Sequence, residues 1–433
     1  MKGIAHIINI LALISLVSCK PGAKLATPPS ETAVGATIHA KDSLLTNLFS
    51  RHRQLFDTLI RQKEVWQMQV IYTQIDRNGN GKPRFTTHTF NLQPDTYFYP
   101  ASTVKFPAAV LALQKLNELG IKGLDKNATM ITAATDGQPG VANDPNSEDG
   151  RPTIANYIKK ILLVSDNDAF NRLYEFLGQE YLNTRLQKMG YDSTQLIHRL
   201  SIALNETQNR TTNAITFYET ANKILYAQPE QRSWLPYQPR HTFIGNGYRS
   251  RGKTVNQPFD FSTKNRLTLP DLHSMLTSII FPDAVAQKQR FGLSADDYNF
   301  LYKYMSMKPS ESRFPQYASS SYPDGDVKFL LFGGEGRMEN PLLRIFNKVG
   351  DAYGFLTDAA YVVDFEKGVE FLLSATIYCN SDGIFNDDRY DYNTVGFPFM
   401  KNLGQVIYEY ELQRSRKHKP DLSAFRVDYT KED

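Results

Sequence analysis

Strand-like segments lie near both ends of this chain, and the residues between them carry mainly helical patterns. The strand candidates, rich in β-branched and aromatic residues, are 65–75, 85–90, 344–348, 357–364 and 369–378. Apolar residues at helical spacing cover 102–119, 154–164, 167–177 and about 397–413. By themselves these patterns predict a protein that combines α-helices with β-strands.

The tetrapeptide Ser102-Thr103-Val104-Lys105 begins the helix predicted at 102–119. Residues three apart lie on one face of a helix, so the Lys105 amine can reach the Ser102 hydroxyl. A serine becomes a good nucleophile when a base takes its proton. We therefore expect Ser102 to be a nucleophile and Lys105 its base. The alternative is a helix-capping serine followed by a surface lysine, because the same spacing recurs at 250–253 without a helical run.

Two further motifs accompany the first. Ser165-Asp166-Asn167 separates two predicted helices, and Lys348-Val349-Gly350 precedes the strand predicted at 357–364. Taken singly, the former is also typical of a turn and the latter of an edge strand. The order Ser-x-x-Lys, Ser-Asp-Asn, Lys-x-Gly resembles that of the serine hydrolase superfamily of class A β-lactamases and penicillin-binding proteins. The resemblance covers roughly residues 60–415.

The resemblance implies an α/β (α+β) fold of the β-lactamase/transpeptidase type. An antiparallel sheet built from both chain ends and flanked by helices would come from residues 41–110 and 341–433. An all-α domain, 111–340, would be inserted, with an irregular insertion at about 228–340. The active site would lie in the cleft between the two.

The resemblance also implies catalytic roles. Ser102 would attack a carbonyl carbon to form an acyl-enzyme, and Lys105 would serve as base. Ser165 would pass a proton to the leaving nitrogen, while Asp166 more plausibly holds the turn. The backbone N–H groups of Ser102 and Asp351 would form the oxyanion hole.

Three residues are expected to bind substrate by the same resemblance. Asn167 would hydrogen-bond the amide side chain of the substrate. Lys348 would attract an anionic group of the substrate, such as a carboxylate, and Gly350 would line the site. Val349 departs from the pattern, because the family carries Thr or Ser there, whose hydroxyl helps to hold the substrate carboxylate.

The loop expected to activate the deacylating water departs as well. Arg199 and Asn205 align with the class A loop, but Ser201 stands where that family has a glutamate. Glu206 follows one residue after the asparagine and would have to be redirected to act. We therefore expect acylation machinery without the usual residue for fast deacylation.

The leading hypothesis is an exported serine hydrolase of the class A β-lactamase type that hydrolyses β-lactams through acyl-Ser102. One alternative is a penicillin-binding-type D-Ala-D-Ala peptidase or an esterase with slow deacylation. Another is a non-catalytic cell-surface binding protein. Val349 and the missing glutamate favour the alternatives.

The first residues have the pattern of an export signal. Lys2 precedes an apolar run at 4–17, and small Ser18 stands before Cys19. Leu16-Val17-Ser18-Cys19 resembles a bacterial lipobox, which implies cleavage after residue 18, a lipid on Cys19 and a tether at 19–40. The alternative is an ordinary signal peptide with an incidental cysteine. The expected location is the bacterial cell envelope, with the membrane contacted through this lipid.

The composition limits the kinds of partner, metal and cofactor that we expect the protein to bind. Lys and Arg number 49 against 45 Asp and Glu, a near-balance that argues against nucleic acid. The eight histidines lack metal-ligand spacing, so we expect no metal and no cofactor. Only Cys19 and Cys379 are present, and Cys379 ends an apolar strand candidate, where it is expected to be packed. We expect a monomer with a small-molecule substrate.

Overall fold

The computed structural model describes residues 37–38, 43–136, 138–219, 223–334, 336 and 338–431. The predicted signal peptide, Cys19 and most of the predicted tether lie outside the described residues. Within the described part, no helix has both the length and the apolar character needed to cross a membrane.

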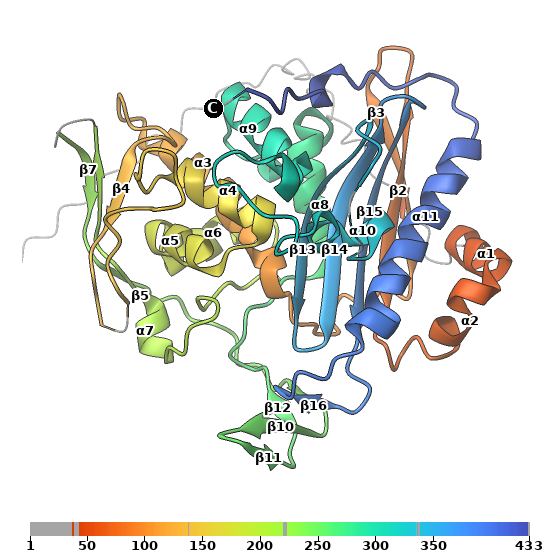
Figure 1. Cartoon of the computed structure of the whole chain (residues 1–433), viewed down its shortest axis with the longest axis horizontal. Coiled ribbons are helices and arrows are strands. Elements are labelled where there is room, and N and C mark those ends of the chain that lie inside the picture. The colour runs from red at the N-terminus through yellow and green to blue at the C-terminus, as the bar shows by residue number, and fades with distance from the viewer. Residues whose placement is uncertain are drawn as a thin grey trace, which may run out of the picture. The chain divides into compact units, whose positions relative to one another are not determined.

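A six-stranded sheet is the centre of the fold, in the order β1-β3-β2-β15-β14-β13 (Figure 1). Its strands are β1 (Thr37–Ile38), β2 (Gln69–Arg77), β3 (Pro83–Phe90), β13 (Leu343–Ala352), β14 (Phe355–Asp364) and β15 (Val369–Tyr378). Each neighbouring pair is antiparallel except β1 with β3. Val70 of β2 is opposite Ala375 of β15, so the two ends of the chain meet in mid-sheet. The predicted antiparallel sheet built from both chain ends is confirmed.

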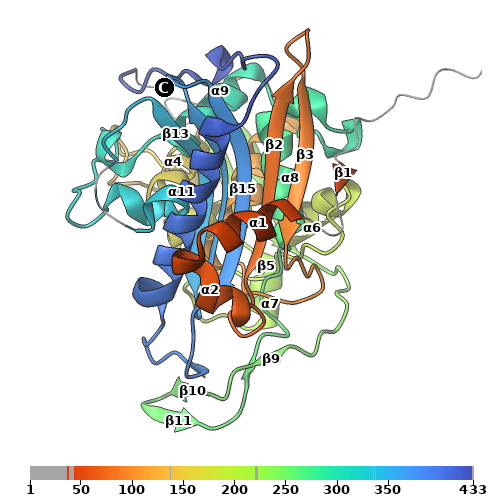
Figure 2. The same cartoon turned by 90° about the vertical axis from the view of Figure 1, so that its right-hand side faces the viewer.

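Helices cover both faces of this sheet. One layer consists of α1 (Ser43–Arg51), α2 (Arg53–Arg61) and α11 (Phe397–Gln413), which cross in front of the strands in Figure 2. The other face carries α8 (Leu269–Ile280) and α9 (Ala295–Ser306). Successive side chains of a strand point to opposite faces. Accordingly, Val362 of β14 packs with the α11 layer and Tyr361 with the α8 layer.

The inserted region begins with a single 3₁₀ turn, η1 (Ala101–Val104), that leads into α3 (Lys105–Leu119). Pro107 lies in the first turn of α3, where its missing N–H would have no helical partner. The helices that pack around α3 are α4 (Ile154–Val164), α5 (Asn167–Leu177) and α6 (Gln179–Lys188), followed by the short α7 (Glu206–Arg210).

This region differs from the predicted all-α domain, because it also contains small sheets. One consists of β4 (Thr129–Thr132), β6 (Ile215–Tyr218) and β7 (Ile224–Gln228), and another of β5 (Thr211–Thr212) and β8 (Gln231–Arg232). Strands of two to five residues carry too little alternation to be recognised in the sequence.

The stretch predicted as an irregular insertion is partly ordered into regular elements. It supplies α8 and α9 and a β-rich projection seen at the bottom of Figure 1. The strands of the projection are β9 (Phe243–Ile244), β10 (Gly247–Ser250), β11 (Lys253–Val255), β12 (Phe259–Asp260) and the later β16 (Ile384–Phe385). Shorter turns are η3 (Pro282–Ala284), η4 (Gln287–Gln289), η5 (Pro309–Glu311), η6 (Asp324–Val327), α10 (Phe329–Phe332), the π-turn η7 (Tyr392–Gly396) and η8 (Ser423–Phe425).

Candidate active site

Ser102 lies in the 3₁₀ turn η1, directly before α3. Side chains three residues apart are eclipsed in a 3₁₀ turn, which places Lys105 over Ser102. The Lys105 Nζ donates a hydrogen bond to the Ser102 Oγ at 2.8 Å. The preceding Ala101 has a φ of +47°, a conformation that is costly for a non-glycine residue. The serine that the sequence singles out is therefore half-buried and in direct contact with the lysine three residues later.

Lys105 is enclosed by acceptors. Its side chain is buried, with 0% exposure, and its Nζ also donates to the Ser165 backbone carbonyl and to the Ser165 Oγ at 3.2 Å. Burial, and then the charge of Lys348, hold the pKa of Lys105 well below its usual range, although Asp166 and Asp351 oppose this shift. A lysine with a lowered pKa is neutral at lower pH, which is the state that a general base needs.

Ser165 is shared by two lysines from opposite sides of the site. It ends α4 with a φ of +57°, and its Oγ accepts a 2.8 Å hydrogen bond from the Lys348 Nζ. Together with the contacts of Lys105, this gives a continuous chain Ser102 Oγ–Lys105 Nζ–Ser165 Oγ–Lys348 Nζ. Such a chain can carry a proton between the two serine hydroxyls and the lysines.

Asp166 holds the turn between α4 and α5, as the sequence predicts. Its carboxylate accepts a 2.8 Å hydrogen bond from the Ala169 amide and so caps α5. The cap fixes Asn167, the first residue of α5. The side-chain Nδ2 of Asn167 donates to the Ser201 Oγ at 2.7 Å. Asn167 and Ser201 thereby form one edge of the site.

Strand β13 passes directly beside η1. A β-carbon on Gly350 would lie 2.8 Å from the Pro100 carbonyl oxygen and 2.9 Å from the Ser102 amide nitrogen. Only glycine permits this approach without displacing one of the two backbones. The strand therefore brings the next residue, Asp351, to the vicinity of the Ser102 amide, where the oxyanion hole is predicted.

Lys348 is held inside the protein rather than extended into solvent. Its side chain is 3% exposed, and its Nζ donates to the Ser165 Oγ and, at 2.8 Å, to the Val349 carbonyl. Burial lowers the pKa of Lys348 to about 7, against the opposing charges of Asp351 and Asp358. The side chain of Val349 is buried in the apolar cluster between the sheet and α11, so it offers no polar contact to a ligand.

The candidate deacylation loop reaches the site at Ser201, which accepts the hydrogen bond from Asn167. Asn171 of α5 holds the loop there, accepting from the Leu200 amide at 2.9 Å and donating to the Leu200 carbonyl at 3.0 Å. Asn205 instead caps α7 by accepting from the Gln208 amide. The Glu206 carboxylate is 76% exposed and pairs with Arg210 at 2.8 Å, so it is engaged at the surface of α7 rather than at Ser102.

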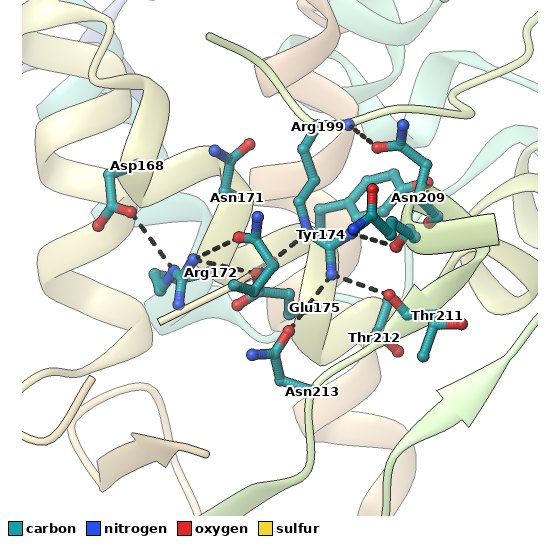
Figure 3. Close-up of polar contacts among 12 residues, drawn as sticks. Asp168, Asn171, Arg172, Tyr174, Glu175, Arg199, Asn209, Thr211, Thr212 and Asn213 are labelled. Atoms are coloured by element: carbon teal, nitrogen blue, oxygen red, sulfur yellow. Dashed lines mark hydrogen bonds and ion pairs between the residues drawn. The ribbon is translucent and has the colours of Figure 1, made fainter. Parts of the chain in front are cut away.

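A buried ionic cluster, shown in Figure 3, anchors the base of this loop. The Arg199 guanidinium donates to Glu175 at 3.1 Å and to the backbone carbonyls of Gln208 and Thr211, each at 3.0 Å. Arg172 pairs with the same Glu175 carboxylate at 3.0 Å. All three ionic side chains are at most 1% exposed.

The sequence interpretation did not single out Arg172 or Glu175. The available signal was an Arg–Glu pair three residues apart within the otherwise aromatic and aliphatic run of α5. Charged residues among buried apolar ones are paired in folded proteins, so this pattern indicates a buried ion pair.

Two expectations concern groups outside this site. Cys379 is buried at the end of β15, and burial raises the pKa of its thiol, so it is a packed residue as predicted. Among the described residues, no three His, Cys, Asp or Glu side chains are grouped so that they could hold a metal ion.

The chain was compared with known proteins. A model of the "Beta-lactamase enzyme family" matches residues 52–410. No curated protein matches the chain. Among solved structures it is similar to a β-lactamase from Xanthomonas campestris, at 14% identity and a TM-score of 0.45 over 83% of this chain and 97% of that one.

Two further similar structures are PBP-A and a class A β-lactamase from Clostridium kluyveri. The first has 16% identity and a TM-score of 0.45, over 86% of this chain and 97% of that one. The second has 13% identity and a TM-score of 0.45, over 83% of this chain and 98% of that one. The family match spans most of the sequence and includes all three motifs, and the chain belongs to the β-lactamase enzyme family.

Proposed function

We propose that this protein is a serine hydrolase that opens β-lactams through an acyl-Ser102 intermediate. The observation that carries the proposal is the hydrogen-bond chain from Ser102 through Lys105 and Ser165 to Lys348. It supports a route for a proton from the nucleophile to a leaving group, inside a site where the pKa of Lys105 is already lowered.

In the acylation step, Lys105 takes the proton of the Ser102 hydroxyl as its Oγ attacks the lactam carbonyl carbon. The carbonyl oxygen becomes negative between the amides of Ser102 and Asp351, the position supported by the close approach of Gly350. The C–N bond then breaks, and the nitrogen takes a proton from the Ser165 hydroxyl, which is replenished from Lys105. The product is an ester of Ser102 with the ring opened.

In the deacylation step, water adds to the ester carbonyl, its hydroxyl stays on the acyl carbon, and a proton returns to the Ser102 Oγ. A base is needed near that water. Ser201 cannot serve, and Glu206 is paired with Arg210 at the surface. We therefore propose that Lys105 serves both steps and that deacylation is slow.

Slow deacylation favours a second candidate function, that of a penicillin-binding-type D-Ala-D-Ala peptidase or an esterase. In that case a β-lactam would acylate Ser102 and leave a long-lived acyl-enzyme, and the natural substrate would be another peptide or ester. A cell-surface binding protein without turnover is the third candidate, and it requires that Ser102 is not acylated at all.

Intact-mass measurement separates the three candidates. The protein is mixed with benzylpenicillin, and in parallel with a fluorophosphonate, and sampled from seconds to hours. An adduct that forms and decays indicates a β-lactamase, a persistent adduct indicates acylation without turnover, and no adduct with either reagent contradicts the proposal. Ser102→Ala is the matched control and should form no adduct.

We also propose that the chain is exported and anchored through a lipid on Cys19. The apolar run at 4–17 followed by Ser18 and Cys19 supports this proposal. The mature protein would act as a monomer in the bacterial cell envelope, where its substrate is a small molecule.

A further inference from the structure

A cavity of about 610 Å³ lies on the inserted region, and none of its lining residues belongs to the candidate active site. Its walls come from α6, from Arg210 at the end of α7, and from the strands β5 and β8. Thr211 of β5 pairs with Arg232 of β8, so the walls formed by these strands are joined by a small β-ladder. A cavity of this volume is large enough for a small organic ligand.

Buried hydroxyl groups form the inner part of this cavity. Thr212 is 0% and Ser233 is 3% exposed, and both residues line the cavity. The Thr212 hydroxyl donates to the Gln231 carbonyl at 3.5 Å, and the Ser233 Oγ accepts from the Leu235 amide at 3.3 Å. Hydrogen bonds of this length are weak, so both hydroxyl groups can turn to donate to a ligand. Gly178 lets β8 approach the start of α6, because a β-carbon there would lie 2.6 Å from the Gln231 Oε1.

Most of the charged side chains that line the cavity are basic. The basic ones are Arg185, Lys188, Arg210 and Arg232, and the acidic one is Glu180. Arg185 pairs with Glu118 at 2.7 Å, and Arg210 pairs with Glu206 at 2.8 Å. Neither of these two carboxylates lines the cavity, so the pairs fix the two guanidinium groups while the lining itself stays positive.

Lys188 and Arg232 are the two cations that a ligand can use directly. Both side chains are exposed, and neither forms an ion pair within the part of the chain that the structure describes. The Arg232 guanidinium lies 4.4 Å from the centre of the Trp234 ring, which restricts where it can point. A restricted guanidinium can donate two parallel N–H groups to an oxyanion, and a lysine nearby adds a point charge.

We propose that this cavity binds an organic phosphate, a phosphate ester of a small molecule or of a lipid. The phosphate oxygens would accept hydrogen bonds from Arg232 and Lys188 at the mouth and from the buried hydroxyl groups further in. A phosphate monoester carries about two negative charges and three acceptor oxygens. It therefore matches two cations and two hydroxyl donors better than a carboxylate does. This site is separate from the proposed acylation of Ser102 and does not depend on it.

The test compares glycerol 3-phosphate with glycerol, which lacks the phosphate, by isothermal titration calorimetry. We expect the phosphate ester to bind and glycerol to give no signal. Arg232→Gln and Lys188→Gln should each weaken binding of the ester about tenfold, because each loses one charge-assisted hydrogen bond. Glu180→Gln should tighten binding, because it removes a negative charge from the lining. Opposite effects of these variants would not arise from a merely structural role.

Two control variants and a thermal melt accompany the titrations. Arg251→Gln removes an exposed positive charge from the turn between β10 and β11 and should bind like the wild type. Ser102→Ala should also bind like the wild type, since the cavity is separate from the nucleophile. The exposed Lys188 and Arg232 can be replaced without loss of packing, so the melting temperatures of their variants should match that of the wild type.

A second measurement distinguishes a free phosphate ester from a lipid headgroup. Cys19→Ser, which lacks the proposed lipid anchor, is sedimented with vesicles of phosphatidylglycerol and, in parallel, of phosphatidylcholine. Binding of glycerol 3-phosphate alone indicates a soluble ester, and sedimentation with phosphatidylglycerol that is lost in Cys19→Ser/Arg232→Gln indicates a headgroup. No binding of the ester at about 10 mM together with no sedimentation would overturn the proposal. Equal affinities of the wild type, Arg232→Gln and Lys188→Gln would overturn it as well.

Discussion

A β-carbon on Gly350 would stand 2.9 Å from the amide nitrogen of Ser102. Two segments that are far apart in sequence, strand β13 and the turn η1, are therefore in backbone contact at the nucleophile. The contact leaves no room for a side chain, so the glycine of the third motif is required by the geometry of the first.

Gly350→Ala should slow acylation by about 10²-fold while the protein stays folded. The new methyl group must push β13 away from η1, and a displacement of about 1 Å costs about 10²-fold in rate. The measurement is the rate of adduct formation with a fluorophosphonate, together with a thermal melt. Gly79→Ala, at a turn glycine with no atom within 4 Å of the added carbon, is the control and should match the wild type.

Acylation by a neutral reagent should increase with pH and level off well below the usual lysine pKa of 10.5. The base must be unprotonated, and burial and Lys348 lower the pKa of Lys105. Burial also lowers the pKa of the neighbouring Lys348 to about 7, so the two lysines are coupled. The rate should therefore rise over a wider range of pH than the titration of a single group would give.

Asp351→Asn should move that profile to lower pH, since the Asp351 charge raises the pKa of Lys105 and its removal lowers it further. Asp283→Asn should leave the profile in place. A profile that moves to higher pH in Asp351→Asn would show that a group other than Lys105 is the base.

Glu175→Gln should destabilise the protein by about 3–5 kcal/mol, because it leaves Arg172 and Arg199 buried without their shared counter-charge. Asp168→Asn is the matched control on the same helix. Asp168 is 66% exposed and 3.6 Å from Arg172, so its loss should cost less than about 1 kcal/mol.

Urea denaturation gives the free energy of unfolding of each variant, which is compared with that of the wild type. Limited proteolysis adds a local readout, because Arg199 holds the loop that begins there. We expect faster cleavage between residues 199 and 213 in Glu175→Gln, and equal cleavage in both variants would argue against this anchoring role.

Ser201→Glu should speed the decay of the acyl-enzyme. Ser201 lies next to Asn167 at the edge of the site, and a carboxylate there could act as the missing base. General-base catalysis is worth about 10²–10⁴-fold, and an unsupported carboxylate should recover only part of this gain. Decay of a penicillin adduct in single-turnover experiments, above and below pH 5, provides the measurement.

Ile202→Glu is the control for Ser201→Glu, since it places the same carboxylate one residue away at another exposed position. Equal decay in the wild type and Ser201→Glu would mean that Ser201 is not at the water-activating position or that Lys105 already serves both steps.

Cys19→Ser should release the protein from membranes, because the proposed lipid on that sulfur is the anchor. Fractionation of cells followed by a high-salt wash measures the change. Retention of the variant in the washed membrane fraction, with residues 1–18 removed, would contradict the lipid anchor.

The long strands and the main helices were predictable from sequence, but their ends were not. β14 and β15 are ten-residue runs buried along their whole length, which gives a strong signal. The prediction for β13 stopped at Lys348, whereas the strand continues to Ala352 through a glycine that usually interrupts strands. Helices α8 and α9 were missed within an aromatic-rich stretch, although Thr268 and Ser294 cap them.

In the candidate site, local spacing predicted the contact of Ser102 with Lys105, because only three residues separate them. The sharing of the Ser165 hydroxyl between Lys105 and Lys348 depends on segments up to 183 residues apart and has no local signal. The same holds for the Arg172–Glu175–Arg199 cluster, in which the second arginine comes from a loop.

The pairing of β2 with β15 also constrains when activity can arise. Ser102 follows the first two long strands of the sheet, whereas Lys348 and Gly350 lie on a strand that reaches them only through β14 and β15. Contacts of such long range form late and slowly. A nascent chain that has not yet reached residue 343 therefore lacks the strand that completes the site around Ser102. A chain cut before residue 343 also leaves β2 without its β15 neighbour, so one edge of that strand is unpaired. The contacts of Lys348 with Ser165 and of Gly350 with the Ser102 backbone therefore depend on the last fifth of the polypeptide.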